Sequence, residues 1–147
     1  MEQRFDVSKL IPEGYKAMFG LHTFVQSCGL DLGLLELVRL RISQINGCAF
    51  CVAMHVPLAR KHGLSDDQIN LVATWKEAPI FSPRERAALV WAEAVTVLTS
   101  QEVPDAAYAQ VQAQFSNEEI AKLTLCISEI NAWNRLMVAS RTPPALA

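Results

Sequence analysis

The sequence predicts an all-α protein, and three observations lead to this fold class. Apolar residues recur at helical spacing along the chain, and the alternating pattern of strands is nearly absent. Three serines are each followed three positions later by Glu or Gln, as the capping box at a helix N-terminus requires. The chain has 147 residues, a length typical of one domain. We therefore expect a single helical domain over residues 1–147.

Two helices are expected before the close pair of cysteines. The shorter one covers residues 13–28. From residue 32 to residue 45, apolar side chains occupy most of the helix circumference, which is typical of a helix buried on several sides. This helix ends at Asn46-Gly47, a pair suited to a left-handed C-terminal cap.

A further helix is expected to begin at about Cys48 and to run to Lys61, with Gly63 stopping it. Pro57 lies inside this segment and has no N–H to donate to the carbonyl of Ala53. We therefore expect the helix to bend or loosen near that turn, as a tolerated kink.

Capping boxes mark three helix starts in the second half of the chain. They are Ser65-Asp66-Asp67-Gln68, Ser82-Pro83-Arg84-Glu85 and Ser116-Asn117-Glu118-Glu119. The helices that follow them are expected over residues 66–76, 83–98 and 117–140. A shorter helix is expected over residues 104–114.

The composition argues against several classes of partner. Thirteen Lys and Arg against fifteen Asp and Glu give a net charge of −2, and the two signs are interspersed. We therefore expect neither nucleic acid nor a membrane surface as a partner. No apolar stretch approaches the roughly 20 residues of a transmembrane helix. Four cysteines are too few for the disulfide framework of a secreted scaffold, so we expect a cytoplasmic protein.

The strongest candidate site is the pair of cysteines Cys48 and Cys51 with His55. On a helix that begins near Cys48 these positions are i, i+3 and i+7, which share one face. A helix N-terminus stabilises a thiolate, and Cys-x-x-Cys sites reach thiol pKa values of about 3.5–7.5. His55 can accept the thiol proton, and a sulfenic acid formed on one sulfur can be trapped by the other as a disulfide. The segment therefore supplies a nucleophile, a resolving thiol and a base.

Glu36 is the second candidate. Apolar residues flank it on both sides, so we expect its carboxylate to be at least partly buried and to need a partner. His55 is one partner, because a carboxylate on one ring nitrogen orients the imidazole and strengthens it as a base. Arg39 and Arg41 are the alternatives, and the sequence leaves the choice open.

A zinc site is an alternative use of the same residues. Cys48, Cys51 and His55 could be three ligands, with a fourth from Cys28 or His62. The chain has no second Cys-x-x-Cys and no His pair at finger spacing, which argues against a closed structural site.

The other chemically interesting residues have ordinary structural interpretations. Cys28 and Cys126 stand in apolar surroundings and are expected to be small core residues. His22 and His62 stand at no useful spacing from other reactive groups. The three tryptophans fall at helical positions and are expected to be core or interface residues: Trp75, Trp91 and Trp133.

The order Glu36, eleven residues, Cys48-x-x-Cys51, three residues and His55 resembles the alkylhydroperoxidase D (AhpD-like) family of the carboxymuconolactone decarboxylase superfamily. The segments LRISQINGCAFCVAMH, HGLSDDQI, FSPRERAALVWAEAVT and INAWNRL agree with this resemblance. They lie within residues 32–137, which would be the family core.

The resemblance implies the family's all-α fold and a thiol peroxidase or disulfide reductase activity without haem, flavin or metal. Cys48 and Cys51 would be the redox pair, and His55 with Glu36 would be the proton relay. Phe50 stands where some members have a His, so a supporting proton donor is missing. The resemblance does not decide which sulfur attacks the peroxide: the helix terminus favours Cys48, whereas adjacency to His55 favours Cys51.

The resemblance also implies partners. The substrate would be an organic hydroperoxide or hydrogen peroxide, the reductant a thiol, often on a lipoylated subunit or a peroxiredoxin, and the assembly a homo-oligomer (trimer or hexamer). Three alternatives remain: decarboxylase chemistry, which does not depend on a thiol pair; a redox-sensing, disulfide-exchange or metal-binding module; and a structural oligomer whose site has decayed.

Overall fold

The computed structural model describes residues 2–99 and 102–145, which contain eight α-helices, one 3-10 helix and no strand. The all-α fold class predicted from the sequence is confirmed. The α-helices are α1 (Val7–Leu10), α2 (Pro12–Gln26), α3 (Leu32–Ile45), α4 (Ala49–Lys61), α5 (Asp66–Leu71), α6 (Pro83–Thr96), α7 (Asp105–Gln112) and α8 (Asn117–Ser140). Within these ranges, no helix combines the length and the apolar character that a membrane crossing requires.

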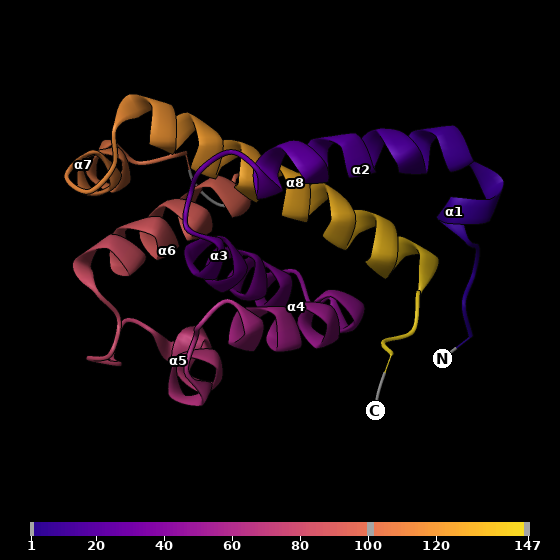
Figure 1. Ribbon diagram of the computed structural model, residues 1–147, viewed down its shortest axis with the longest axis horizontal. Coiled ribbons are helices and arrows are strands. Elements are labelled where there is room, and N and C mark those ends of the chain that lie inside the picture. The colour runs from indigo at the N-terminus through magenta and orange to yellow at the C-terminus, as the bar shows by residue number, and fades with distance from the viewer. Residues whose placement is uncertain (1, 100–101, 146–147) are drawn as a thin grey trace.

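Helix α3 lies at the centre of the molecule, between α4, α6 and α8 (Figure 1). Every residue from Gly33 to Leu40 is buried, in agreement with the apolar character of most of its circumference. The side chain of Asp31 caps the helix by accepting a hydrogen bond from the Leu34 N–H at 2.8 Å. Because α3 is covered on several sides, polar groups on it must find partners inside the protein.

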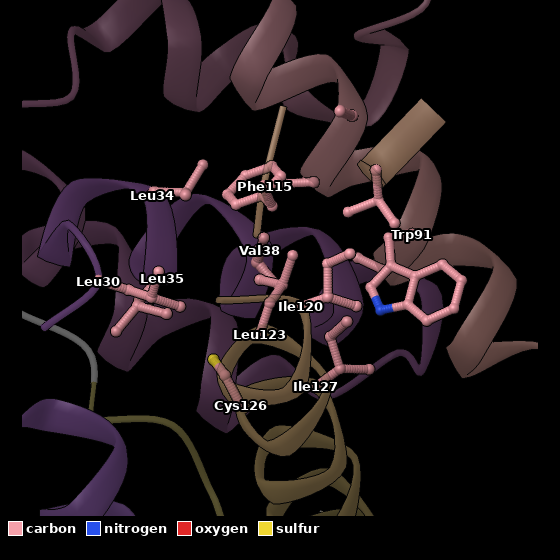
Figure 2. Packing of buried hydrophobic residues seen from close by; sticks show 14 of the residues in the cluster. Leu30, Leu34, Leu35, Val38, Trp91, Phe115, Ile120, Leu123, Cys126 and Ile127 are labelled. Atoms are coloured by element: carbon pink, nitrogen blue, oxygen red, sulfur yellow. The ribbon is translucent and has the colours of Figure 1, made fainter. Parts of the chain in front are cut away.

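Apolar side chains pack on two sides of α3. On one side its residues meet those of α6, the loop after α7, and α8 (Figure 2). Figure 2 shows Leu35 and Val38 of α3 close to Leu123 and Cys126 of α8. On the other side, Leu37 packs with residues of α4, α6 and the segment between them. Helix α3 therefore joins two apolar clusters.

The three predicted capping boxes are present. In each, the serine side chain accepts from the backbone N–H three residues on, and the Glu or Gln side chain accepts from the serine N–H. The predicted starts of α5, α6 and α8 are therefore correct, because the capping contacts are local and need no tertiary partner.

Several of the expected helices have different bounds in the structure. The helices expected over residues 83–98 and 104–114 are shorter, Pro83–Thr96 and Asp105–Gln112. The helix expected over residues 66–76 ends at Leu71 and continues as a 3-10 helix, Val72–Thr74. Arg86 donates hydrogen bonds to the carbonyls of Trp75, Lys76 and Ala78, and these contacts from α6 hold the following segment in turns. The helix expected over residues 13–28 is Pro12–Gln26.

Helix α1 was not predicted. Asp6 nucleates this single turn by accepting hydrogen bonds from the N–H groups of Ser8 and Lys9. Four residues are too few to display helical periodicity in the sequence. Helix α4 begins one residue later than expected, with Cys48 as its N-cap, and it continues through Pro57.

Gly33 allows the start of α3 to lie against the end of α4. A Cβ atom on Gly33 would lie 2.8 Å from the carbonyl oxygen of His62, which is closer than van der Waals contact permits. We expect Gly33→Ala to lower the free energy of unfolding by about 1–3 kcal/mol, measured by urea denaturation.

Gly20 provides the matched control for this substitution. It is an exposed residue of α2, and a Cβ atom there would meet nothing within 4 Å. Gly20→Ala should stabilise the protein by about 0.5–1 kcal/mol, because alanine restricts the unfolded chain. Equal effects of the two substitutions would contradict the close approach at Gly33.

Candidate active site

The two cysteines of the candidate site lie at the N-terminus of α4. Cys48 is the N-cap, and its Sγ accepts a hydrogen bond from the Cys51 N–H at 3.3 Å. The two sulfurs are joined as a disulfide, with 5.3 Å between the Cα atoms. Both residues are buried. The helix terminus therefore directs the Cys51 N–H toward the sulfur of Cys48, a contact that would stabilise a thiolate there.

His55 lies one turn beyond Cys51 and is almost fully buried, with 2% of its surface exposed. Its Nδ1 lies 2.7 Å from Oε2 of Glu36. Because an ionised carboxylate can only accept, Nδ1 carries a hydrogen, and in the neutral imidazole Nε2 then carries the lone pair. Nε2 is buried without a hydrogen-bond partner. The free nitrogen of His55 is thus the one suited to accept a proton.

The His55–Glu36 contact belongs to a longer buried chain of charged groups. Arg39 donates to Oε1 of Glu36 at 2.8 Å and to Oε2 of Glu129 at 3.0 Å. The other oxygen of Glu129 lies 2.7 Å from Nδ1 of His22. The sequence of contacts is therefore His55, Glu36, Arg39, Glu129, His22, and it joins α4, α3, α8 and α2. We call these five residues the charge network.

The sequence had left His55 and two arginines as alternative partners of Glu36. The structure shows that Glu36 binds His55 and Arg39 together, one through each carboxylate oxygen. Arg41 instead pairs with Glu93 at 2.8 Å. The expected burial of Glu36 is confirmed, since only 1% of its surface is exposed.

Both carboxylates of the network stay ionised despite burial. For Glu36, burial raises the pKa, but the hydrogen bond from His55 and the charge of Arg39 outweigh it, so the pKa lies below 4.5. For Glu129, burial is outweighed in the same way by His22 and Arg39. Burial alone would lower the pKa of Arg39, yet the two carboxylates raise it. The guanidinium therefore stays charged.

A cavity of about 120 Å³ lies beside Cys51 and His55. Its wall is mostly aromatic and thioether side chains: Tyr15, Phe19, Phe50, Met54, Trp133 and Met137. Its polar groups are Cys51, His55, His22, Glu129 and the Tyr15 hydroxyl. The cavity therefore combines an apolar wall with a sulfur and two imidazoles, an arrangement that suits a small ligand with one reactive polar end.

Cys48 lines a different hollow. A groove of about 310 Å³ runs between the start of α4 and the segment after α8, and it is lined by Cys48, Phe50, Met137 and residues 141–144. Cys51 does not line this groove, and Cys48 does not line the cavity. The two cysteines of the disulfide thus line different hollows, which share Phe50 and Met137.

The sequence interpretation missed His22, Glu129 and the bridging role of Arg39. A signal for Glu129 existed, because it stands one turn after the buried Cys126 on the apolar face of α8, as Glu36 stands among apolar residues on α3. His22 carried no such signal, since its partner lies 107 residues away on another helix.

The remaining cysteines and tryptophans follow the sequence interpretation with one exception. Cys126 is a core residue, and burial raises the pKa of its thiol to about 12, so it is no nucleophile at neutral pH. Cys28 packs at the edge of the same cluster. Trp75 and Trp91 are buried. Trp133 is the exception, because it forms part of the cavity wall and packs against two other aromatic rings.

The zinc alternative has no geometric counterpart in the described part of the chain. Within residues 2–99 and 102–145, no three His, Cys, Asp or Glu side chains are placed to hold one metal ion. Of the residues that a zinc site would use, Cys48 and Cys51 are joined as a disulfide, and Nδ1 of His55 is engaged by Glu36.

The chain is similar to known proteins in sequence and in structure. The family described as "Carboxymuconolactone decarboxylase family" matches residues 12–94. The uncharacterized protein YdfG of Bacillus subtilis is 37% identical over 139 residues, which are 95% of each chain.

Solved structures extend this similarity. A protein of unknown function from Agrobacterium tumefaciens, for which antioxidant defence of the AhpD type has been suggested, is 44% identical with a TM-score of 0.97. The alignment covers 99% of this chain and 100% of that one. An AhpD-core, peroxidase-related protein from Ralstonia eutropha shares the fold at 23% identity and a TM-score of 0.83, over 95% and 74% of the two chains.

Arg39 should be essential for stability. Arg39→Met keeps an apolar stem of similar length but leaves two buried carboxylates without their cation, so we expect about 3–5 kcal/mol less stability in urea unfolding. Arg41→Met is the matched control, because the Arg41–Glu93 pair is partly exposed and should cost about 1 kcal/mol or less. Similar losses would contradict the bridging role.

The network also predicts how stability depends on pH. A carboxyl whose folded pKa lies below its unfolded value stabilises the fold above the unfolded pKa, and this contribution is lost as the pH falls through the folded pKa. The unfolding free energy should therefore decrease as the pH falls below about 4.5, where the unfolded carboxyls begin to bind protons.

Two variants test which carboxyls cause this dependence. Glu129→Gln removes one titrating group of the network, so its stability should change less with pH than that of the wild type. Glu118→Gln removes an exposed carboxylate and should leave the wild-type slope. Unfolding by urea at intervals from about pH 6 to about pH 3 measures the slopes. Parallel slopes in all three proteins would contradict the assignment.

Proposed function

The chain belongs to the carboxymuconolactone decarboxylase family and is AhpD-like, and from this premise we propose that it is a thiol peroxidase. It reduces hydroperoxides through a Cys48–Cys51 disulfide. The observation that carries the proposal is that Cys51 and His55 line one small cavity and that Nε2 of His55 has no hydrogen-bond partner. A thiol, a base and a confined space for substrate are the parts that the reaction needs.

The reaction begins with the reduced cysteine pair. His55 accepts the proton of the Cys51 thiol at Nε2, while Glu36 stabilises the imidazolium through Nδ1. The thiolate attacks the outer oxygen of the hydroperoxide, and the O–O bond breaks. Cys51 becomes a sulfenic acid, and the remaining oxygen leaves as an alcohol after it takes up a proton.

The second half of the reaction forms the disulfide. The Cys48 thiol attacks the sulfur of the sulfenic acid, and the hydroxyl leaves as water after taking up the proton that Cys48 loses. A thiol reductant then attacks the disulfide, and a second thiol completes the exchange, so that the reductant is oxidised and both cysteines are restored. The groove beside Cys48 suits this exchange, because it reaches a sulfur from outside the substrate cavity.

Cys51 is our choice for the sulfur that attacks the peroxide. It borders the cavity that contains His55, whereas Cys48 borders the groove. A reductant thiol that enters the groove attacks the sulfur of Cys48, and Cys51 then leaves as the thiolate.

Disulfide exchange without peroxide chemistry is the second candidate. The separate groove at Cys48 favours it, because a partner thiol could reach the disulfide there without entering the cavity. Muconolactone decarboxylation gains no comparable support, since that chemistry leaves the paired cysteines without a role.

Two serine variants test the peroxidase proposal. Reduced wild-type protein should consume one equivalent of cumene hydroperoxide and form a disulfide between Cys48 and Cys51, detected by peptide mass mapping without reductant. Cys51→Ser should consume none. Cys48→Ser should consume about one equivalent and hold a sulfenic acid on Cys51, detected by dimedone labelling.

Cys28→Ser is the matched control, because it removes a thiol that lies outside the cavity and the groove. It should behave as the wild type does. Unchanged thiols and unchanged peroxide in the wild type would exclude the peroxidase and leave disulfide exchange. A sulfenic acid on Cys48 in the Cys51→Ser protein would reverse the assignment of the two sulfurs.

A further inference from the structure

The charge network ends at a second imidazole that the reaction above does not use. His22 on α2 is held through Nδ1 by Glu129, as His55 is held by Glu36, with 2.7 Å in both contacts. Both rings border the cavity that contains Cys51. Since Nδ1 of His22 is engaged by the carboxylate, Nε2 is the nitrogen left for proton exchange.

The charges of the network leave room for one further positive charge. Glu36 and Glu129 contribute two negative charges, and Arg39 contributes one positive charge. One imidazolium, on either His22 or His55, makes the network neutral. Tyr15 is the other titratable side chain besides Cys51 that borders the cavity.

Solvent exposure distinguishes the two imidazoles. The side chain of His22 is 29% exposed, whereas that of His55 is 2% exposed. His22 can therefore exchange protons with solvent directly, whereas His55 is enclosed by the protein. This difference suits His55 to accept the proton of Cys51 and His22 to donate a proton that solvent replaces.

We propose that His22 is a catalytic residue that protonates the leaving oxygen of the hydroperoxide in the cavity. The inference rests on the proposed peroxidase function. When the Cys51 thiolate attacks the outer oxygen, the electrons of the O–O bond pass to the inner oxygen, which would leave as an alkoxide. Nε2 of His22 gives this oxygen a proton, the product is an alcohol, and His22 regains its proton from solvent.

The presence of Phe50 at the cavity explains why the proposed reaction needs a separate proton donor such as His22. Phe50 lies between the two cysteines and borders the cavity, but its ring has no proton to donate. His55 holds the proton of Cys51 at the same moment, in a buried position. His22 supplies a separate donor from α2, on a helix remote in sequence from the cysteines.

Two peroxides with different leaving groups test the inference. Cumene hydroperoxide and peroxybenzoic acid both carry a phenyl ring, but the first releases a basic alkoxide and the second a stable carboxylate that needs no proton. In single turnovers of reduced protein, His22→Gln should react about 100-fold more slowly than wild type with cumene hydroperoxide. Its rate with peroxybenzoic acid should stay close to that of the wild type.

His62→Gln is the matched control, since His62 lies at the end of α4 and borders neither the cavity nor the groove. It should react as the wild type does with both peroxides. Equal slowing of His22→Gln with both peroxides, or no slowing with either, would overturn the role of His22 and leave the peroxidase intact. Failure of the wild type to react with either peroxide would instead overturn the peroxidase itself, and His22 with it.

A second variant distinguishes the loss of proton donation from a general effect on folding. His22→Ala removes the ring from a partly exposed position, and added imidazole should restore several-fold of its rate with cumene hydroperoxide. Imidazole should not change the wild-type rate. Absence of rescue, in a protein whose thermal unfolding matches that of the wild type, would contradict proton donation by His22.

Discussion

The rest of the structure depends on the ion pairs that the buried guanidinium of Arg39 forms with Glu36 and Glu129. Arg39 lies on the central helix and binds a carboxylate from its own helix and another from α8. Taking three charges out of water costs several kcal/mol for each ion, and only their mutual contacts offset this cost. Each carboxylate uses its other oxygen for a histidine, so the same contacts that hold α3 against α8 also orient both imidazoles.

The apolar surroundings give these charges their chemical effect. Helix α3 is covered by α4, α6 and α8 (Figure 1), so water does not reach Glu36 or Arg39. In such an environment a hydrogen bond or a charge acts more strongly than in water. Aromatic side chains from α2 and α8 close the cavity over Cys51. Cys51 lines this cavity, whereas Cys48, three residues away in the sequence, lines the groove instead.

The candidate segment with the two cysteines could be identified from the sequence because its parts are local. Cys48, Cys51 and His55 lie within two turns of one helix, and helical geometry alone brings them to one face. Glu36 was found through its apolar neighbours, but the choice between an imidazole and a guanidinium could not be made. Both partners were correct, since a carboxylate has two oxygens and the packing of α4 on α3 supplies one partner to each.

The sequence by itself determined the all-α class, the capped helix starts and the cysteine pair with a histidine on the same helix, because short-range contacts and helical periodicity specify them. Only the tertiary structure decided that Glu129 and His22 lie at the candidate site, that Trp133 borders the cavity, and that the two cysteines line different hollows. These features depend on how α2 and α8 pack against the central helix. Residues 22 and 129 are 107 positions apart, and no local pattern records a contact over that distance.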